Sequence, residues 1–196
     1  CAAVASKMLM GQGRPATLPN WLAAVVKDVR VSVRLVFWLV LAAVVVGLDQ
    51  WTKGLADLHL DYARPVTILP MLNFTLQYNT GAAFSFLSDA GGMQRWFFSA
   101  LAAIVSIGLV IWMATLPARE WFLGVGLGFI LGGALGNLWD RLLLGHVIDF
   151  VSVHYDGSYF PAFNVADSAI TLGAIIMIVD SIGQARRERQ EQQENG

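Results

Sequence analysis

Two aspartates, Asp149 and Asp167, lie among apolar residues in the stretch VIDFVSVHYDGSYFPAFNVADSAI. Charged side chains in such surroundings are costly, and they mark functional sites. If the two carboxyl groups approach each other, one keeps its proton at neutral pH while the other stays ionised. Such a pair can hydrolyse a peptide, because the carboxylate takes a proton from attacking water and the acid protonates the oxyanion or the leaving amine. The spacing does not assign the proton to either one.

Each aspartate also has a structural interpretation. Asp167 suits the N-cap of a following helix, although Asn164 competes for that position and would leave Asp167 in the first turn. Asp149 can be a loop acid near a membrane interface. No Ser–His or Cys–His pair competes for the hydrolytic role, because Ser152 and His154 have no counterparts in the other polar motifs.

Two motifs in the first half of the chain carry further polar residues. LDQWTK places Asp49 and Lys53 at i and i+4, a spacing suited to an ion pair that fixes the depth of a helix end or supports a site. In YNTGAAFSF, Asn79 and Gly81 indicate a turn. Asn79 is either a turn residue or a hydrogen-bonding arm towards a ligand.

A third motif, GGALGNLWDR, contains Asn137, Asp140 and Arg141. These residues can anchor a helix end at the lipid headgroups. However, Asn137 lies inside the last predicted turn of an apolar segment, where an amide needs partners. Arg141 has five donors, which can hold a peptide carbonyl or a carboxylate. We therefore favour a functional or site-supporting role over simple anchoring.

The composition of the chain indicates which kind of structure holds these residues in place. The chain has 196 residues, 56% hydrophobic and 14% charged, with a mean hydropathy of +0.58. Soluble domains have about 45–50% apolar and about 25% charged residues, so an integral membrane protein is predicted. The net charge of −1 argues against nucleic acid as a partner. With one cysteine, and three histidines that lack zinc-motif spacing, we expect no metal and no other cofactor.

Four segments reach the roughly 20 apolar residues that a span needs, at about 31–48, 96–116, 121–139 and 163–182. The predicted fold class is an all-α integral membrane protein with four transmembrane helices and a small extracytoplasmic β-sheet. Alternation of apolar and polar residues in FTLQYN, residues 74–79, predicts one strand of that sheet. The preceding VTILPML predicts an edge-like strand, because it contains a proline. An ordered loop is the alternative.

The spans divide the chain into three parts. An N-terminal extension over 1–30 lacks the apolar core of a signal peptide and is expected to be cytoplasmic and flexible. A four-span membrane domain over 31–184 is expected to have extracytoplasmic segments at 49–95 and 140–162. A charged tail over 185–196 is expected to be disordered. No lipobox precedes Cys1, which favours a sequence that begins inside a longer reading frame.

Lysine and arginine gather at both termini and in the turn at 117–120, which the positive-inside rule assigns to the cytoplasm. The polar motifs then fall at one level near the outer face. They contribute Asp49, Asn79, Asn137, Asp140, Arg141, Asp149 and Asp167. Such convergence from distant parts of the sequence is expected of a site.

A ladder of glycines four residues apart runs along the third span, at Gly124, Gly128, Gly132 and Gly136. Small residues at this spacing let another helix approach closely. We expect packing within the bundle, with a dimerisation face as the alternative.

The chain resembles the bacterial lipoprotein signal peptidases (signal peptidase II) over about residues 33–182. The resemblance rests on five blocks in order: LDQWTK, YNTGAAFSF, GGALGNLWDR, GHVIDF and FNVADSAI. It implies an aspartyl endopeptidase of the bacterial inner membrane that cleaves the signal peptide from prolipoproteins before a cysteine carrying diacylglycerol. The implied partners are lipidated prolipoproteins, membrane lipids and cyclic peptide inhibitors such as globomycin.

The resemblance also implies roles for individual residues. Asp149 and Asp167 fall on the catalytic dyad. The substrate-binding or site-supporting positions are Asn79, Gly81, Asn137, Asp140, Arg141, Asn164, Asp49 and Lys53.

Two other classes of function compete with this prediction. A small proton-coupled transporter also uses intramembrane acids, but here the acids cluster at one face and no inverted repeat is visible. A structural membrane module that binds partners through the glycine ladder leaves the acids unexplained.

Overall fold

The computed structural model describes residues 20–81 and 93–194. The helices are α1 (Asn20–His59), α2 (Met93–Thr115), α3 (Trp121–Leu143) and α4 (Val165–Glu194). The strands are β1 (Val66–Leu69), β2 (Leu72–Asn79), β3 (Val147–Tyr155) and β4 (Ser158–Tyr159). Most of the expected N-terminal extension, including Cys1, lies outside the described residues.

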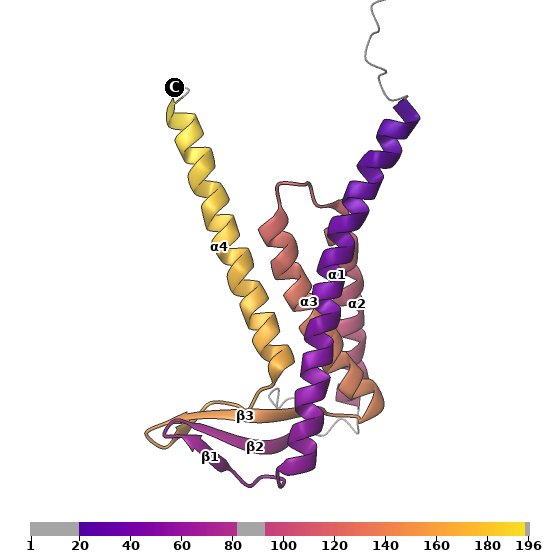
Figure 1. Cartoon of the computed structure of the whole chain (residues 1–196). Helices are drawn as coiled ribbons and strands as arrows, with labels where there is room; N and C mark the ends of the chain where they lie inside the picture. The colour runs from indigo at the N-terminus through magenta and orange to yellow at the C-terminus, as the bar shows by residue number, and fades with distance from the viewer. Residues whose placement is uncertain (1–19, 82–92, 195–196) are drawn as a thin grey trace, which may run out of the picture.

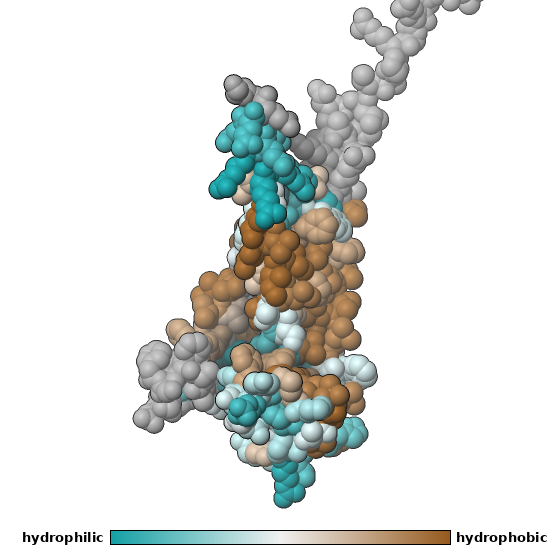
Figure 2. Space-filling view, turned by 90° about the vertical axis from the view of Figure 1, so that its left-hand side faces the viewer, coloured by the Kyte–Doolittle hydropathy of each residue, from teal (hydrophilic) through white to brown (hydrophobic). Residues whose placement is uncertain are grey.

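All four helices are long and apolar enough to cross a membrane. The segments concerned are Val33–His59, Met93–Thr115, Trp121–Leu143 and Val165–Gln193. The sheet lies at one end of the bundle, and α1 begins and α4 ends at the other (Figure 1). A broad hydrophobic surface lies between the sheet and the hydrophilic end of α4 (Figure 2). The predicted fold class, four transmembrane helices with a small sheet, is confirmed.

The first helix extends well past the predicted end of its span at residue 48, to His59. Asp49 and Lys53 do not end it, because they form an ion pair of 2.7 Å across one helical turn and both are buried. An ion pair between residues four apart on the same helix stabilises that helix, so these charges do not interrupt it. Part of the segment expected outside the spans is therefore helical.

The last helix also differs from expectation, because α4 continues through the charged tail to Glu194. The disorder expected for this part of the tail is wrong. Arginine, glutamate and glutamine favour helix, and the tail contains neither proline nor glycine before Gly196. The helix therefore extends beyond the apolar part of the span.

The glycine ladder of α3 faces α1, as predicted for packing within the bundle. Its members are Gly124, Gly128, Gly132 and Gly136. A Cβ on the first would collide with the Trp38 ring, and a Cβ on the last would lie 2.6 Å from the Asp49 carboxylate. The absence of side chains on this face allows α1 to approach α3 closely and brings Asp49 against α3.

The sheet is antiparallel with strand order β1-β2-β3-β4. The predicted strands correspond to β1 and β2, whereas β3 lies in a stretch expected to be a connector. Its first four residues are all buried, so it lacks the alternation that signals a half-buried strand. The pairing of β3 with β2 places Asp149 opposite Gln77 and Val147 opposite Asn79. This register places the YNTG turn, residues 78–81, next to Asp149.

Candidate active site

The two aspartates come from different elements. Asp149 lies on β3 with 2% of its surface exposed, and Asp167 lies in the first turn of α4, partly buried. Both are connected to Asn164, the residue before α4 begins. The strand and the helix start therefore meet at one point, as the topology of the spans predicted.

Asn164 is fully buried and bonds both acids. Its Oδ1 accepts the backbone N–H of Asp167 at 2.9 Å, and its own N–H donates to Asp167 Oδ2 at 3.3 Å. This reciprocal pair is a capping box, so Asn164 is the N-cap and Asp167 occupies the first turn. The Nδ2 of Asn164 donates to Asp149 Oδ1 at 2.7 Å.

Two further amides complete the contacts of the pair. Asn79 Nδ2 donates to Asp149 Oδ2 at 3.0 Å, and Asn137 Nδ2 donates to Asp167 Oδ1 at 2.7 Å. Both oxygens of each carboxyl group therefore accept a hydrogen bond from a neutral donor. The amides hold the carboxyl groups in place without neutralising them.

The orientation of each amide is fixed by a second partner that can only donate. Asn79 Oδ1 accepts the N–H of Gly81 at 2.8 Å, and Asn137 Oδ1 accepts from the Lys53 ammonium at 3.0 Å. A backbone N–H and an ammonium are donors only, so each oxygen must face them. The NH₂ groups are left to face the two aspartates.

Gly81 supports the first of these contacts through its backbone. Its φ is +97°, a conformation that favours glycine. A Cβ there would also lie 2.8 Å from the Phe98 ring. The YNTG motif thus needs glycine both for the turn and for space.

A second cluster of charge lies beside the dyad. Lys53, 1% exposed, contacts Asp49 at 2.7 Å and Asp140 at 2.8 Å. Asp49 Oδ1 accepts the N–H of Ala166 at 2.8 Å, at the start of α4, and Asp140 Oδ2 accepts the N–H of Ile148 at 3.2 Å, on β3. Through these bonds the cluster fixes the residues that adjoin both catalytic candidates.

Gln50 also belongs to this cluster and was not predicted from the sequence. Its Nε2 donates to Asp140 Oδ1 at 2.7 Å and to Asp49 Oδ2 at 3.2 Å. It also donates to the backbone oxygen of Gly136 at 3.2 Å. Gln50 stands between the predicted residues Asp49 and Lys53 in LDQWTK, and this position was the available signal.

Arg141 lies beside the dyad in another way. Its Nη1 donates to the backbone oxygen of Asn137 at 3.2 Å, and the guanidinium lies 5.5 Å from the centre of the Phe98 ring. It is half-buried and within electrostatic reach of both Asp149 and Asp167. The structure thus places every predicted site residue in or beside one network.

The electrostatics of Asp149 follow from its surroundings. Burial raises the pKa of Asp149 to about 7, and the nearby Asp167 acts in the same direction. The hydrogen bonds from Asn79 and Asn164 oppose this rise in pKa, as does the more distant charge of Lys53. A carboxyl group with this pKa is partly protonated at neutral pH, as general acid–base chemistry requires.

A cavity of about 540 Å³ opens beside Asp167. Its walls include Phe160 and Phe163 from the segment before α4, and Leu172 and Ile175 from α4. An apolar hollow with a carboxyl group at its edge can receive an apolar ligand next to a reactive group. Phe150, by contrast, does not line this cavity and is buried against Phe74.

The sequence model of signal peptidase II matches residues 41–183 of the chain. The chain belongs to the signal peptidase II family. It is therefore a membrane-spanning peptidase that cleaves signal peptides, and a transporter function is not supported.

Relatives and solved structures of this kind resemble most of the chain. The lipoprotein signal peptidase of Acinetobacter baumannii is 57% identical over 144 residues, 74% of this chain and 82% of the relative. That of Teredinibacter turnerae is 51% identical over 145 residues, 74% of this chain and 86% of the relative. A bacterial membrane enzyme solved by the in meso method at 1.9 Å is 34% identical with a TM-score of 0.65, covering 74% of this chain and 91% of that one.

Proposed function

We propose that this signal peptidase is of the aspartic type and that Asp149 and Asp167 activate the water that cleaves a prolipoprotein. The observation that carries the proposal is the arrangement of the pair. The two carboxyl groups come from separate elements, share Asn164, and accept hydrogen bonds from neutral amides. One proton shared between them at neutral pH supplies both a base and an acid.

The reaction follows from the pair holding one proton. The ionised carboxylate takes a proton from water as the water oxygen bonds to the scissile carbonyl carbon. The carboxylic acid then protonates the amide nitrogen as the C–N bond breaks. The pair again holds one proton, now on the other carboxyl group, because one acid has gained the proton taken from water and the other has given its proton to the leaving amine.

The surrounding residues act on substrate or on the pair. Asn79, Asn137 and Asn164 hold the carboxyl groups, and Arg141 binds a substrate carbonyl next to them. The cluster of Lys53, Asp49 and Asp140 holds α1, α3, β3 and the start of α4 together. Gly81 keeps Asn79 turned towards Asp149.

The location of the pair suits a substrate anchored in the bilayer. The dyad lies where the sheet meets the helices, so a lipidated cysteine can reach it while its acyl chains stay among apolar residues. Both termini are cytoplasmic in this proposal, and the site faces the outer side of the bacterial inner membrane. The named relatives are lipoprotein signal peptidases, which supports a prolipoprotein as substrate. We propose that this substrate carries diacylglycerol and that globomycin-like cyclic peptides act as inhibitors.

The test uses the purified full-length protein and a synthetic prolipoprotein with or without diacylglycerol on its cysteine. We expect cleavage just before the cysteine of the modified peptide, mapped by mass spectrometry, and none with Asp149→Asn. Equal cleavage of the unmodified peptide would contradict the proposed substrate class. Cleavage by Asp149→Asn at the rate of the unaltered protein would contradict the aspartic mechanism.

A further inference from the structure

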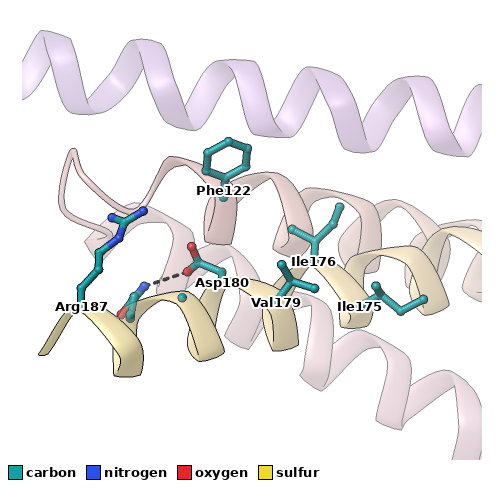
Figure 3. A pocket seen from close by; sticks show the side chains of 8 residues that line it. Phe122, Ile175, Ile176, Val179, Asp180 and Arg187 are labelled. Carbon is teal, nitrogen blue, oxygen red and sulfur yellow. Dashed lines mark hydrogen bonds between the residues drawn. The ribbon is translucent and has the colours of Figure 1, made fainter. Parts of the chain in front are cut away.

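Two hollows lie along α4 and have a residue in common. The first, beside Asp167, extends along α4 to Ile175. The second, about 380 Å³, begins at Ile175 and extends to Arg187, with Phe122 of α3 on its other side (Figure 3). The two hollows meet at Ile175, and we refer to them together as one groove, which follows α4 from the dyad towards the end of the bundle that lies away from the sheet.

The α4 side of this groove consists of two rows of residues four apart. One row is Asp167, Thr171, Ile175, Val179, Gly183 and Arg187. The other is Ser168, Leu172, Ile176, Asp180 and Gln184. Rows of this spacing are the ridges between which a neighbouring helix packs. The middle of both rows is apolar, and Val179 and Ile175 are exposed.

Two carboxylates lie at the far end of the groove, Asp180 in its lining and Glu120 beside it. Gln184 Nε2 donates to Glu120 Oε2 at 2.6 Å and to Asp180 Oδ2 at 2.8 Å, so a carboxylate at the start of α3 and one on α4 meet at one amide (Figure 3 shows the second bond). Glu120 is 12% exposed, whereas Arg119, which pairs with it at 3.2 Å, is 85% exposed. Arg187 is also exposed, at the rim. The acids are the more buried groups and the arginines the more exposed ones.

We propose that this groove is the docking surface for the apolar helix of the substrate's signal peptide, with the peptide's cationic end at Glu120 and Asp180. The inference rests on the proposed function and identifies where that substrate lies. A signal peptide has a positively charged N-terminal region followed by about 7–15 apolar residues, which span about 10–22 Å as a helix. Asp167 and Asp180 are about 20 Å apart along α4 at roughly 1.5 Å per residue.

The direction in which a signal peptide would lie also supports it as the occupant of the groove. Cleavage occurs after the apolar segment, at the end of the groove where Asp167 lies. The cationic region precedes that segment and therefore falls at the opposite end, where the two carboxylates lie. Acidic groups there complement its charge, and the apolar rows complement the segment between.

The first test obstructs the groove with a bulky side chain. Val179 and Ile178 are neighbours with similar exposure, 63% and 59%, but only Val179 lines the groove. We expect Val179→Trp to raise KM for the full lipidated substrate about tenfold or more, while Ile178→Trp leaves it unchanged. Neither variant should alter cleavage of a lipidated peptide shortened to the few residues around the scissile bond.

The second test changes charge. With Glu120→Gln and Asp180→Asn combined, we expect KM to rise several-fold for a substrate with a lysine-rich N-terminal region and to stay unchanged when those lysines are glutamine. Glu188→Gln, an exposed acid farther along α4, is the matched control and should change neither.

The outcomes separate this inference from the proposed function. If the unaltered protein cleaves the full substrate but Val179→Trp and Ile178→Trp behave alike, the groove is not the docking surface while the function stands. An equal loss with the shortened peptide would show a general defect and also overturn it. A rise in KM with Arg187→Gln, and none with the two acid substitutions, would replace the peptide by an anionic lipid headgroup.

Discussion

Two pairs of aspartates lie side by side in this protein and differ in what compensates their charge. Asp49 and Asp140 both contact the Lys53 ammonium, at 2.7 and 2.8 Å. Asp149 and Asp167 accept hydrogen bonds from amides and a backbone N–H. Among the described residues, no ion pair joins either of the latter two to a cation within 4.0 Å.

This difference distinguishes a structural role for the first pair from an acid–base role for the second. A buried carboxylate in contact with an ammonium has its charge compensated by that cation, and it holds its neighbours in place. A buried carboxyl group held only by neutral donors keeps the ability to bind or release a proton near neutral pH, as the pKa of Asp149 shows. In the proposed mechanism, the same residue type thus supports the site in one pair and performs the reaction in the other.

The largest effect should come from removing the charge of the second pair. Asp149→Asn or Asp167→Asn loses an acid–base group and is expected to lower kcat by about 10²–10⁴ or more, with the folded protein retained in the membrane. The cleavage rate of a lipidated prolipoprotein measures this. Asp61→Asn, at an exposed aspartate paired with Arg64, is the control and should keep full activity. Full activity of either variant would contradict the acid–base role that distinguishes Asp149 and Asp167 from Asp49 and Asp140.

Next in size is the removal of the shared cation from the first pair. Lys53→Met leaves two buried carboxylates without compensation, and we expect the free energy of unfolding to fall by about 3–5 kcal/mol. Thermal unfolding in detergent micelles measures the loss. Arg64→Met removes an exposed cation and should cost less than about 1 kcal/mol. Equal stability of the Lys53 and Arg64 variants would show that the buried cluster is not structural.

A smaller effect is expected where the two pairs are joined. Asn137 accepts from Lys53 and donates to Asp167, so Asn137→Ala leaves a partner unsatisfied on each side. Leaving a buried polar group without its hydrogen bond costs about 1–3 kcal/mol. We therefore expect kcat to fall about tenfold to hundredfold, while KM stays near its original value. Asn73→Ala, at another buried amide in β2, is the control. A change confined to KM would indicate that Asn137 contacts substrate and does not position Asp167.

The smallest effect concerns pH. Asp149 has a raised pKa of about 7, so its acid form is present below that pH and is lost above it. We expect kcat/KM to fall about tenfold per pH unit on the alkaline side. The hydrogen bond from Asn79 favours the ionised form, so Asn79→Ala should raise the pKa and move this alkaline limb to higher pH. A shift to lower pH would contradict the assigned direction of that bond.

Much of the fold was predictable because it depends on local properties of the chain. Apolar length indicated the four spans, and alternation indicated the strand that became β2. The connector that contains β3 was not recognised, because a strand buried on both faces has no alternating pattern. The charged tail was expected to be disordered, although its residues favour helix in the structure.

The site was predictable in its members but not in its contacts. Residue types, their depth in the membrane and the resemblance to signal peptidase II selected Asp149, Asp167 and the surrounding polar residues. The sequence left open whether Asn164 or Asp167 caps α4, and only the position of Gln50 next to Asp49 pointed to its role. These questions depend on which donor faces which acceptor across large separations in the chain.

By itself, the sequence determined that this protein spans a membrane four times and carries its polar residues at one level, because span length and hydrophobicity are set residue by residue. Only the tertiary structure decided which aspartates share Lys53 and which share Asn164. The close approach of α1 to α3 brings an ammonium to one pair, while the pairing of β3 with β2 brings amides to the other. The chemistry of each carboxyl group follows from that choice of neighbours.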